Sequence, residues 1–176
     1  MRPATIMLLA LGLTACAAAP DIGPEQGRYR SHDVQLSVSG PAGCGQADAA
    51  TVASAIASTS SLRAASGLGP VRADPRLVQI AAQQACHMAR TGRMSHAGPS
   101  GEGPMRRAKD AGYAPALIAE NIAAGPFDLR GVLSVWAGSR EHRANATMRG
   151  VVHMGIGSAT DASGNRYWAA VYGAPR

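Results

Sequence analysis

Apolar residues recur every three or four positions in several stretches of the chain, the spacing that gathers them on one face of a helix. One such helix is expected over residues 48–63. A second should follow Asp74, whose side chain can cap a helix that has Pro75 at its first position. A short third helix is expected over 104–111, and a fourth after Asp128, another candidate N-cap. Helices therefore come first in the folded part of the chain.

Towards the C-terminus the apolar residues indicate strands instead of helices. Two strands are expected at 151–158 and 166–173, joined by a segment of sequence Asp-Ala-Ser-Gly-Asn that is typical of a turn. Residues 117–119 fit either a short strand or a turn, and 34–38 alternate as a short edge strand would. Helices followed by an antiparallel hairpin predict an α+β fold, with a small sheet sandwiched by helices.

The first residues have a different character. An apolar run over 6–13 follows the positive charge of Arg2, is too short to span a bilayer, and suits the core of a signal peptide. The small residues before Cys16 resemble the lipobox of bacterial lipoproteins, in which this cysteine is acylated; the alternative is an ordinary signal peptide. We therefore expect a signal peptide over 1–15, a lipidated Cys16 with a flexible, Gly- and Pro-rich tether over 16–45, and one domain over 46–176.

Lipidation at Cys16 would anchor the chain to a membrane without a spanning helix. Ala17 follows the cysteine in place of Asp, which by analogy with lipoproteins favours the periplasmic side of the outer membrane. In such a compartment Cys44 and Cys86 are expected to form a disulfide, although two unpaired thiols remain the alternative. A metal site built on them is disfavoured, because neither belongs to a Cys-x-x-Cys or Cys/His cluster.

The distribution of the charged residues along the chain argues against nucleic acid as a partner. Lys and Arg number 17 against 11 Asp and Glu, a net charge of +6. The basic residues are scattered, and no aromatic residue interleaves with the small cluster at Arg106, Arg107 and Lys109 as a nucleic-acid stacking platform would require. Nucleic acid is therefore not expected as a partner. A positive surface suits anionic envelope polymers or lipid headgroups, or serves solubility alone.

Three short polar islands interrupt the apolar chain, around His96, Glu120 and His142. Alone they are a weak signal, because no pair has the spacing of a helical zinc motif. Their context resembles the CAP superfamily of cysteine-rich secretory, antigen 5 and pathogenesis-related proteins, in its small bacterial branch. The likeness rests on stretches in matching order: Leu62–Leu77, Ala85–His96, Gly112–Gly125, Trp136–Asn145, His153–Gly157 and Tyr167–Gly173.

This resemblance implies an α-β-α sandwich with a cleft lined by two His and two Glu. His96, Glu120 and His142 match three of these positions and could hold zinc or another divalent cation, or Glu120 could instead orient an imidazole. The second Glu is displaced: Ser139 stands at its place, and Glu141 is the nearest substitute. Asn121, beside Glu120, completes the set of candidate cleft residues.

Two functions follow as hypotheses from the resemblance. The leading one is an envelope lipoprotein that binds a lipid or a peptidoglycan-type ligand at this cleft. The alternative is a hydrolase acting on peptide or cell-wall bonds, with Glu120, Ser139 and His142 as the candidate catalytic residues.

Overall fold

Two long strands near the C-terminus form the middle of the sheet, as the hydrophobic pattern predicts. β6 (His153–Asp161) and β7 (Arg166–Pro175) pair antiparallel in a computed structural model that describes residues 33–176. Asp161 closes the turn between them, because its Oδ1 accepts hydrogen bonds of 2.9 Å from the main-chain N–H groups of Ser163 and Asn165. The turn chemistry of the sequence thus sets the register of the hairpin.

The remaining strands extend this hairpin on both sides. The order is β2 (Ala42–Cys44), β6, β7 and β5 (Pro115–Gly125), and β3 (Arg72–Ala73) runs parallel to β6. A separate pair joins β1 (Val34–Gln35) to β4 (Arg93–Met94). β5 is much longer than the segment 117–119 expected from the sequence, because it pairs with β7 almost to its ends.

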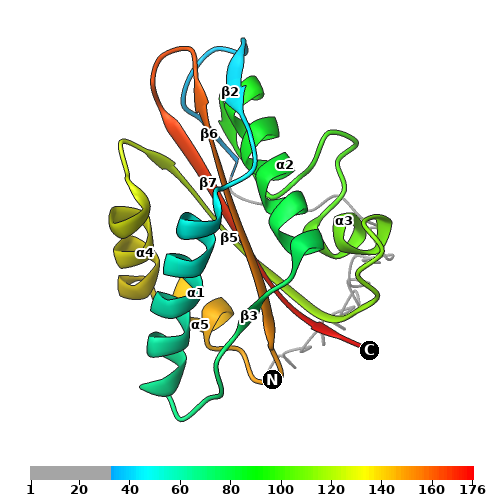
Figure 1. Ribbon diagram of the computed structural model, residues 1–176. Coiled ribbons are helices and arrows are strands. Elements are labelled where there is room, and N and C mark those ends of the chain that lie inside the picture. Colours follow the sequence, from blue (N-terminus) through cyan, green and yellow to red (C-terminus); the bar gives the residue numbers. More distant parts are fainter. Residues whose placement is uncertain (1–32) are drawn as a thin grey trace, which may run out of the picture.

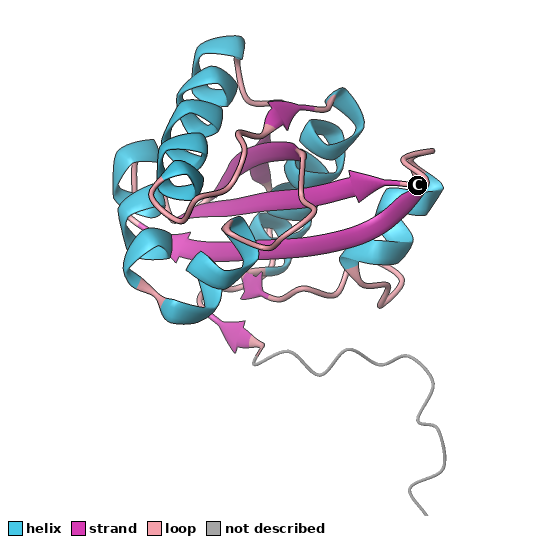
Figure 2. Ribbon diagram, turned by 90° about the horizontal axis from the view of Figure 1, so that it is seen from below, coloured by secondary structure: helices cyan, strands magenta, loops and turns pink. Residues whose placement is uncertain are grey.

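Helices cover both faces of the sheet. α1 (Ala49–Ala64), α4 (Leu129–Gly138) and α5 (Arg140–Ala146) lie on one side, and α2 (Pro75–Thr91) and α3 (Pro104–Asp110) lie on the other (Figure 1). The long strands cross the domain between these groups (Figure 2). The fold is therefore α+β with three layers, as expected. No helix in the described part of the chain is both long enough and apolar enough to cross a membrane.

Capping residues start and stop the helices where the sequence indicates. Asp48, Asp74 and Asp128 each accept a hydrogen bond from a main-chain N–H in the first turn of α1, α2 and α4. Gly92 ends α2 in the left-handed conformation that favours glycine. The sequence does not predict α5 as a separate helix. Helix α4 ends at Ser139, whose backbone is extended, and α5 begins directly after it.

An apolar core lies on each face of the sheet, between the strands and the helices that cover them. On the α1 side Trp136, Met154 and Tyr172 are buried, and on the α2 side Leu77, Met88 and Val171 are buried. α2 lies directly on β6, because a Cβ atom at Gly155 would collide with the main chain of Leu77 and Val78. Glycine at this position of the strand therefore allows the close approach of the helix.

The end of the expected tether is joined to the domain. β1 pairs with β4, β2 pairs with β6, and Cys44 forms a disulfide with Cys86 on α2, with an S–S length of 2.09 Å. The disulfide prediction is confirmed. Residues 34–44 differ from a flexible tether in this respect, because sheet pairing and a covalent bond hold them. The expected signal peptide and Cys16 lie outside the described residues.

Candidate functional site

Glu120 is a buried carboxylate at the edge of the sheet. It lies on β5, the last strand in the sheet order, and its side chain is 1% exposed. Its Oε1 is 2.8 Å from Nδ1 of His96, and its Oε2 accepts a 2.6 Å hydrogen bond from Nη2 of Arg107. The structure thus brings together two of the predicted residues, His96 and Glu120, and adds a cation that the sequence did not single out.

Arg107 organises the segment that carries His96. Its Nη1 donates 2.9 Å hydrogen bonds to the main-chain oxygens of His96 and Glu102, while its Nη2 binds Glu120. A buried carboxylate is strongly disfavoured unless a cation and hydrogen bonds compensate it, and this guanidinium supplies both. The result is a chain of contacts from Arg107 through Glu120 to the imidazole of His96. In the sequence Arg107 belongs to the small basic cluster with Arg106 and Lys109, and nothing there distinguishes it from those two residues.

His142 lies on α5, on the opposite side of the sheet from α3 and Arg107. Its ring lies beside Trp136, with 6.4 Å between ring centroids, and its main-chain oxygen accepts a 3.0 Å hydrogen bond from Asn121. The ring atom Nδ1 is buried and has no hydrogen-bond partner among residues 33–176. Burial lowers the pKa of His142, and His96 nearby lowers that pKa further. The imidazole is therefore uncharged at neutral pH and presents a buried polar atom with which no described residue pairs.

The position of β5 explains how two layers contribute to one site. Successive side chains of a strand point to opposite faces of the sheet, so Glu120 reaches Arg107 on α3 while Asn121 reaches α5. Asn121 also accepts a 2.8 Å hydrogen bond from Asn145. Because β5 is the edge strand, residues of both faces meet around it. Asn145 had no role in the sequence prediction, and its contact depends on the tertiary fold.

Ser139 and Glu141 take less part in this group. Ser139 lies at the junction of α4 and α5, and its hydroxyl makes no hydrogen bond to His142 or to any other described residue. Glu141 is exposed at the surface of α5 and reaches His142 only through its charge, which acts to raise that pKa. A nucleophile–base pair of Ser139 and His142 is thus not formed in this arrangement. Glu141 as a substitute for the displaced second carboxylate stays a prediction.

The donor set does not fit a metal centre. Within residues 33–176, no three His, Cys, Asp or Glu side chains group closely enough to hold a metal ion. Both carboxylate oxygens of Glu120 are already engaged, one by His96 and one by Arg107. The geometry agrees with the other arrangement expected from the sequence, in which Glu120 orients an imidazole.

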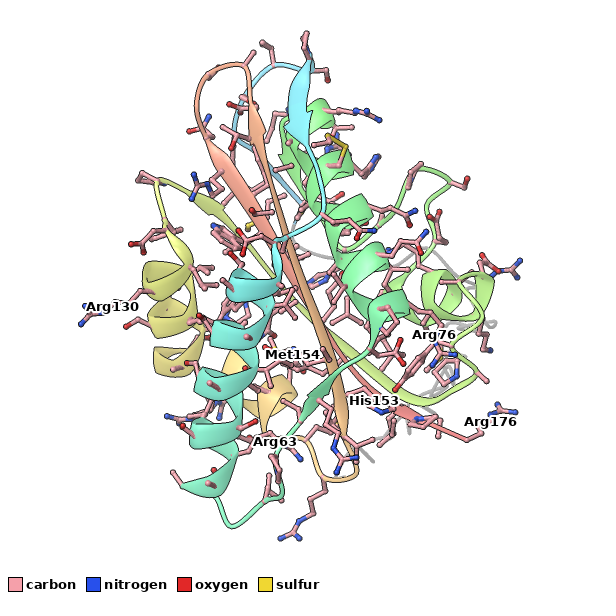
Figure 3. The ribbon with its side chains drawn as sticks, in the orientation of Figure 1. Arg63, Arg76, Arg130, His153, Met154 and Arg176 are labelled. Carbon is pink, nitrogen blue, oxygen red and sulfur yellow. A yellow bond between two sulfur atoms is a disulfide. The ribbon has the colours of Figure 1, made fainter. Side chains whose placement is uncertain are left out.

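His153 belongs to a different cluster. Its Nδ1 is 2.9 Å from the hydroxyl of Tyr113, over whose ring the Arg76 guanidinium lies at 5.1 Å. Figure 3 shows Arg76 and His153 approaching the same corner from α2 and β6. Burial raises the pKa of Tyr113 to about 12, so the phenol stays protonated. This cluster joins the start of β6 to the segment after α3.

The fold and the chain order of these residues agree with a known family. A model of the cysteine-rich secretory protein family, abbreviated CAP, matches residues 56–172. The chain belongs to this family. The match covers β5, α5, β6 and most of β7, and with them Glu120 and His142. No protein with a curated description matches the chain by sequence.

Solved structures share the CAP-domain fold at low sequence identity. An outer surface protein of Borrelia burgdorferi aligns with a TM-score of 0.65 and 18% identity, over 76% of this chain and 99% of its own. An SCP-domain extracellular protein of Bacillus anthracis gives 0.63 and 20%, over 71% of this chain. A cysteine-rich secretory protein of Staphylococcus aureus gives 0.55 and 15%, over 70%. The alignments span only 40% and 38% of those last two proteins, so they support the fold alone.

Proposed function

We propose that this CAP-domain protein is an envelope lipoprotein that binds an uncharged polar group of a lipid or cell-envelope molecule at the edge of β5. His96, Glu120, Asn121 and His142 would line the site, with Glu141 at its rim. The observation that carries the proposal is the buried Nδ1 of His142, which lacks a partner among residues 33–176; His96, a member of the Arg107–Glu120–His96 chain, is near enough to lower the pKa of this imidazole. Leaving such an atom unpaired costs about 1–3 kcal/mol, and a ligand that pairs with it would remove this cost.

The charges favour an uncharged ligand. Arg107 compensates Glu120, and the lowered pKa of His142 keeps its imidazole neutral. A formally charged headgroup would therefore find no counter-charge in the centre of the site as the described residues form it. A hydroxyl or amide can donate to or accept from a neutral imidazole, whose two ring nitrogens are one donor and one acceptor. Sterol-like alcohols and sugar hydroxyls have this chemistry.

Three observations support placement outside the cytoplasm. The residues before Cys16 resemble a lipobox, the disulfide Cys44–Cys86 is of a kind that persists in oxidising compartments, and two of the similar structures are described as outer surface or extracellular proteins. Lipidation is tested by growing cells with an alkyne fatty acid. The wild-type chain should be labelled and Cys16→Ser should not. An unlabelled wild type would refute the anchor while leaving the ligand site open.

The ligand site is tested by thermal unfolding of the full chain against a panel of envelope lipids, sterols and peptidoglycan fragments. A ligand present at a hundred times its Kd should add about 2.7 kcal/mol to the free energy of unfolding. His142→Gln should remove that increment, because it removes Nδ1, whereas Arg130→Gln, at an exposed position in the first turn of α4, should retain it. An equal increment in wild type and His142→Gln would refute the site.

A hydrolase at the same residues is the second candidate. The observation in its favour is the 2.8 Å contact between Glu120 and His96, since a carboxylate that orients an imidazole is a common support for a general base. Purified protein would then release fragments from peptidoglycan or casein, and His96→Gln would abolish the release. Ligand binding without turnover on both substrates would exclude this candidate.

A further inference from the structure

Three large apolar side chains are exposed within one short segment, residues 34–38. Val34 is 41% exposed, Leu36 45% and Val38 85%, and Val38 is the most exposed of the large hydrophobic residues that the structure describes. The other large hydrophobic residues that are exposed lie apart from one another in the chain: Met105, Leu117, Val135 and Val152. A single exposed apolar side chain is ordinary, whereas several together indicate a partner.

The polar residues between these three face the domain. Gln35 Nε2 donates a 3.0 Å hydrogen bond to the main-chain oxygen of Thr91, and Ser39 Oγ donates to the same oxygen at 3.2 Å. Ser37 Oγ donates a 2.7 Å hydrogen bond to the carboxylate of Asp161. Side chains of an extended chain alternate between its two sides. The segment therefore turns polar side chains towards the domain and apolar ones outward, the reverse of an ordinary surface strand.

Main-chain contacts fix the segment in this orientation. The N–H of Leu36 donates a 2.8 Å hydrogen bond to the oxygen of Gly92, and the N–H of Gly40 donates a 2.9 Å bond to the oxygen of Arg90. A Cβ atom at Gly92 would collide with the main chain of Ser37, so the segment lies directly on the end of α2. The aliphatic side chains are thus held at the surface, where only an external partner can cover them.

The position of the segment in the chain favours a membrane as that partner. The match to the family begins at residue 56, so residues 34–38 precede the part of the chain that the family shares. Val34 lies 18 positions after Cys16, the proposed site of acylation. A chain of that length spans at most about 60 Å when fully extended. An anchor at Cys16 would therefore keep the segment close to the bilayer, and in this respect the inference rests on the proposed lipoprotein.

The charges beside the segment suit anionic headgroups. Arg93 lies opposite Gln35 in the β1–β4 pair, and its side chain is 54% exposed. Arg90, whose main-chain oxygen holds Gly40, is exposed as well. Asp33 lies 3.6 Å from Arg93 and offsets part of this charge. Basic side chains that flank exposed aliphatic ones are typical of surfaces that bind the interface of an anionic bilayer.

A second copy of the chain fits this surface less well. Each partner of a stable dimer buries about 800 Å², much more than three partly exposed side chains supply. β1 has only two residues, so pairing at its edge would add few hydrogen bonds. A bilayer requires no such area, because each aliphatic side chain that leaves water contributes by itself.

We propose that residues 34–38 form a membrane-docking surface, in which Val34, Leu36 and Val38 enter the acyl-chain boundary of an anionic bilayer. Arg90 and Arg93 would meet the lipid phosphates. His96 follows β4 by two residues, and β4 pairs with the segment. Docking would therefore bring the proposed ligand site close to the lipids.

The test uses an environment-sensitive dye at position 38 of the full chain. In a Cys16→Ser background, Cys44 and Cys86 are joined to each other, so Val38→Cys supplies the single free thiol for the dye NBD. Vesicles of equal parts phosphatidylglycerol and phosphatidylcholine should shift its emission to the blue, and lipids with a nitroxide on the acyl chain should quench it. Because Cys16→Ser removes the proposed acylation site, a failure here is distinct from a failure of the lipid anchor, which fatty-acid labelling tests.

Val135→Cys, labelled in the same background, is the matched control. Val135 is also an exposed valine, at 44%, and lies on α4, on the other side of the sheet from α2 (Figure 1). Its dye should keep the emission of an aqueous environment. This comparison separates docking through the segment from attraction of the vesicle to the dye or to another part of the chain.

Further substitutions divide the apolar contribution from the charged one. Val34→Ser combined with Leu36→Ser should raise the lipid concentration at half-maximal shift at least about tenfold. Arg90→Gln should raise it about fivefold with the anionic vesicles, and pure phosphatidylcholine should require more lipid than these vesicles do. All three positions are exposed, so the core stays intact.

Four results would overturn the proposal. One is an unshifted dye at position 38 with the anionic vesicles, and another is an equal shift at positions 38 and 135. A shift at the same lipid concentration with pure phosphatidylcholine would remove the anionic surface as the partner. A dye at position 38 that is already blue-shifted without vesicles would show that protein covers the segment. That protein is a second copy if the shift grows with protein concentration, and another part of the same chain if it does not.

Discussion

Arg107 and Glu120 form an ion pair that is almost entirely removed from solvent. Nη2 and Oε2 lie 2.6 Å apart, and the two side chains are 6% and 1% exposed. One comes from a short helix and the other from the edge strand, so the pair joins two layers of the fold. It also connects to His96 through both its members. The stability of this region and the geometry of the candidate site thus depend on the same contacts.

Glu120→Gln should therefore destabilise the protein strongly. The substitution leaves the guanidinium of Arg107 buried without its counter-charge, which costs about 3–5 kcal/mol for a buried pair. The free energy of unfolding in urea measures the effect. Asp110→Asn is the matched control, because it breaks the exposed Arg106–Asp110 pair, worth about 0–1 kcal/mol. Equal losses in the two variants would contradict the assignment of Arg107 and Glu120 as a buried pair.

Local signals in the sequence predicted much of the fold. Asp48, Asp74 and Asp128 mark helix starts because their side chains bond nearby N–H groups, an interaction within one turn of chain. The sequence does not predict the full length of β5, because this length depends on contacts with distant parts of the chain. Glu120 and Asn121 interrupt its apolar pattern, and both are buried only because residues of α3 and α5 pair with them.

The sequence predicted some residues of the candidate site and not others. Family resemblance located His96, Glu120 and His142, and the structure places His96 against Glu120. Arg107 carries no local signal, since its neighbour Arg106 has the same residue type and is paired at the surface. Only the tertiary fold distinguishes the buried arginine from the exposed one. The same holds for Gln84 Oε1 and Arg107 Nε, which are buried without a hydrogen-bond partner among residues 33–176.

The disulfide should contribute substantially to stability. Cys44 and Cys86 are 42 positions apart, so closing this loop restricts the unfolded chain and stabilises the fold by about 4 kcal/mol. Thermal unfolding with and without reductant measures the difference. The variant with both cysteines changed to Ser should match the reduced protein and should not respond to reductant. An unchanged midpoint on reduction would show that the bond does not hold the N-terminal strands to the domain.

Stability should fall as the solution is acidified below neutral pH. Burial lowers the pKa of His142 and of His87 below the ordinary value of 6.5. Between 6.5 and the lower folded values, the unfolded chain binds protons that the folded chain excludes, so acid favours unfolding. The contribution of these groups is complete above the unfolded pKa and is lost as the pH falls below it.

The slope of unfolding free energy between about pH 7 and 5 isolates this effect. His142→Gln should make the slope shallower even if it lowers stability at every pH, and His87→Gln should reduce the slope by its own share. The double variant should have the shallowest slope of the four proteins. A slope in His142→Gln identical to that of the wild type would contradict a neutral, partly buried imidazole.

Zinc should not stabilise the protein through His96 and His142. Arg107 and His96 engage both oxygens of Glu120, so a metal would have to break the buried ion pair to gain a carboxylate ligand. Unfolding with added zinc, compared with a chelator, tests this. A site filled at a hundred times its Kd would add about 2.7 kcal/mol, which is easily measured. A zinc-dependent gain that both His96→Ala and His142→Ala abolish would contradict the prediction.

Gly155 should be intolerant of even the smallest side chain, because α2 rests on this point of β6. A Cβ atom there would meet main-chain atoms of Leu77 and Val78, which cannot rotate away as a side chain could. Gly155→Ala should therefore lower the free energy of unfolding by about 1–3 kcal/mol. Gly138→Ala is the control. A methyl group there would lie more than 4 Å from every described residue outside its own turn of α4, and alanine favours a helix by up to about 1 kcal/mol.

The same substitution links the fold to the candidate site. α2 carries Gln84, which holds the main-chain oxygens of Ser95 and Ala97 on either side of His96. If the methyl group of Gly155→Ala displaces α2, the NMR signals of His96 should shift together with those of Leu77. In Gly138→Ala the His96 signals should stay in place, because the added methyl group meets no neighbouring element. Shifts confined to Leu77 would show that the loop carrying His96 is held independently of α2.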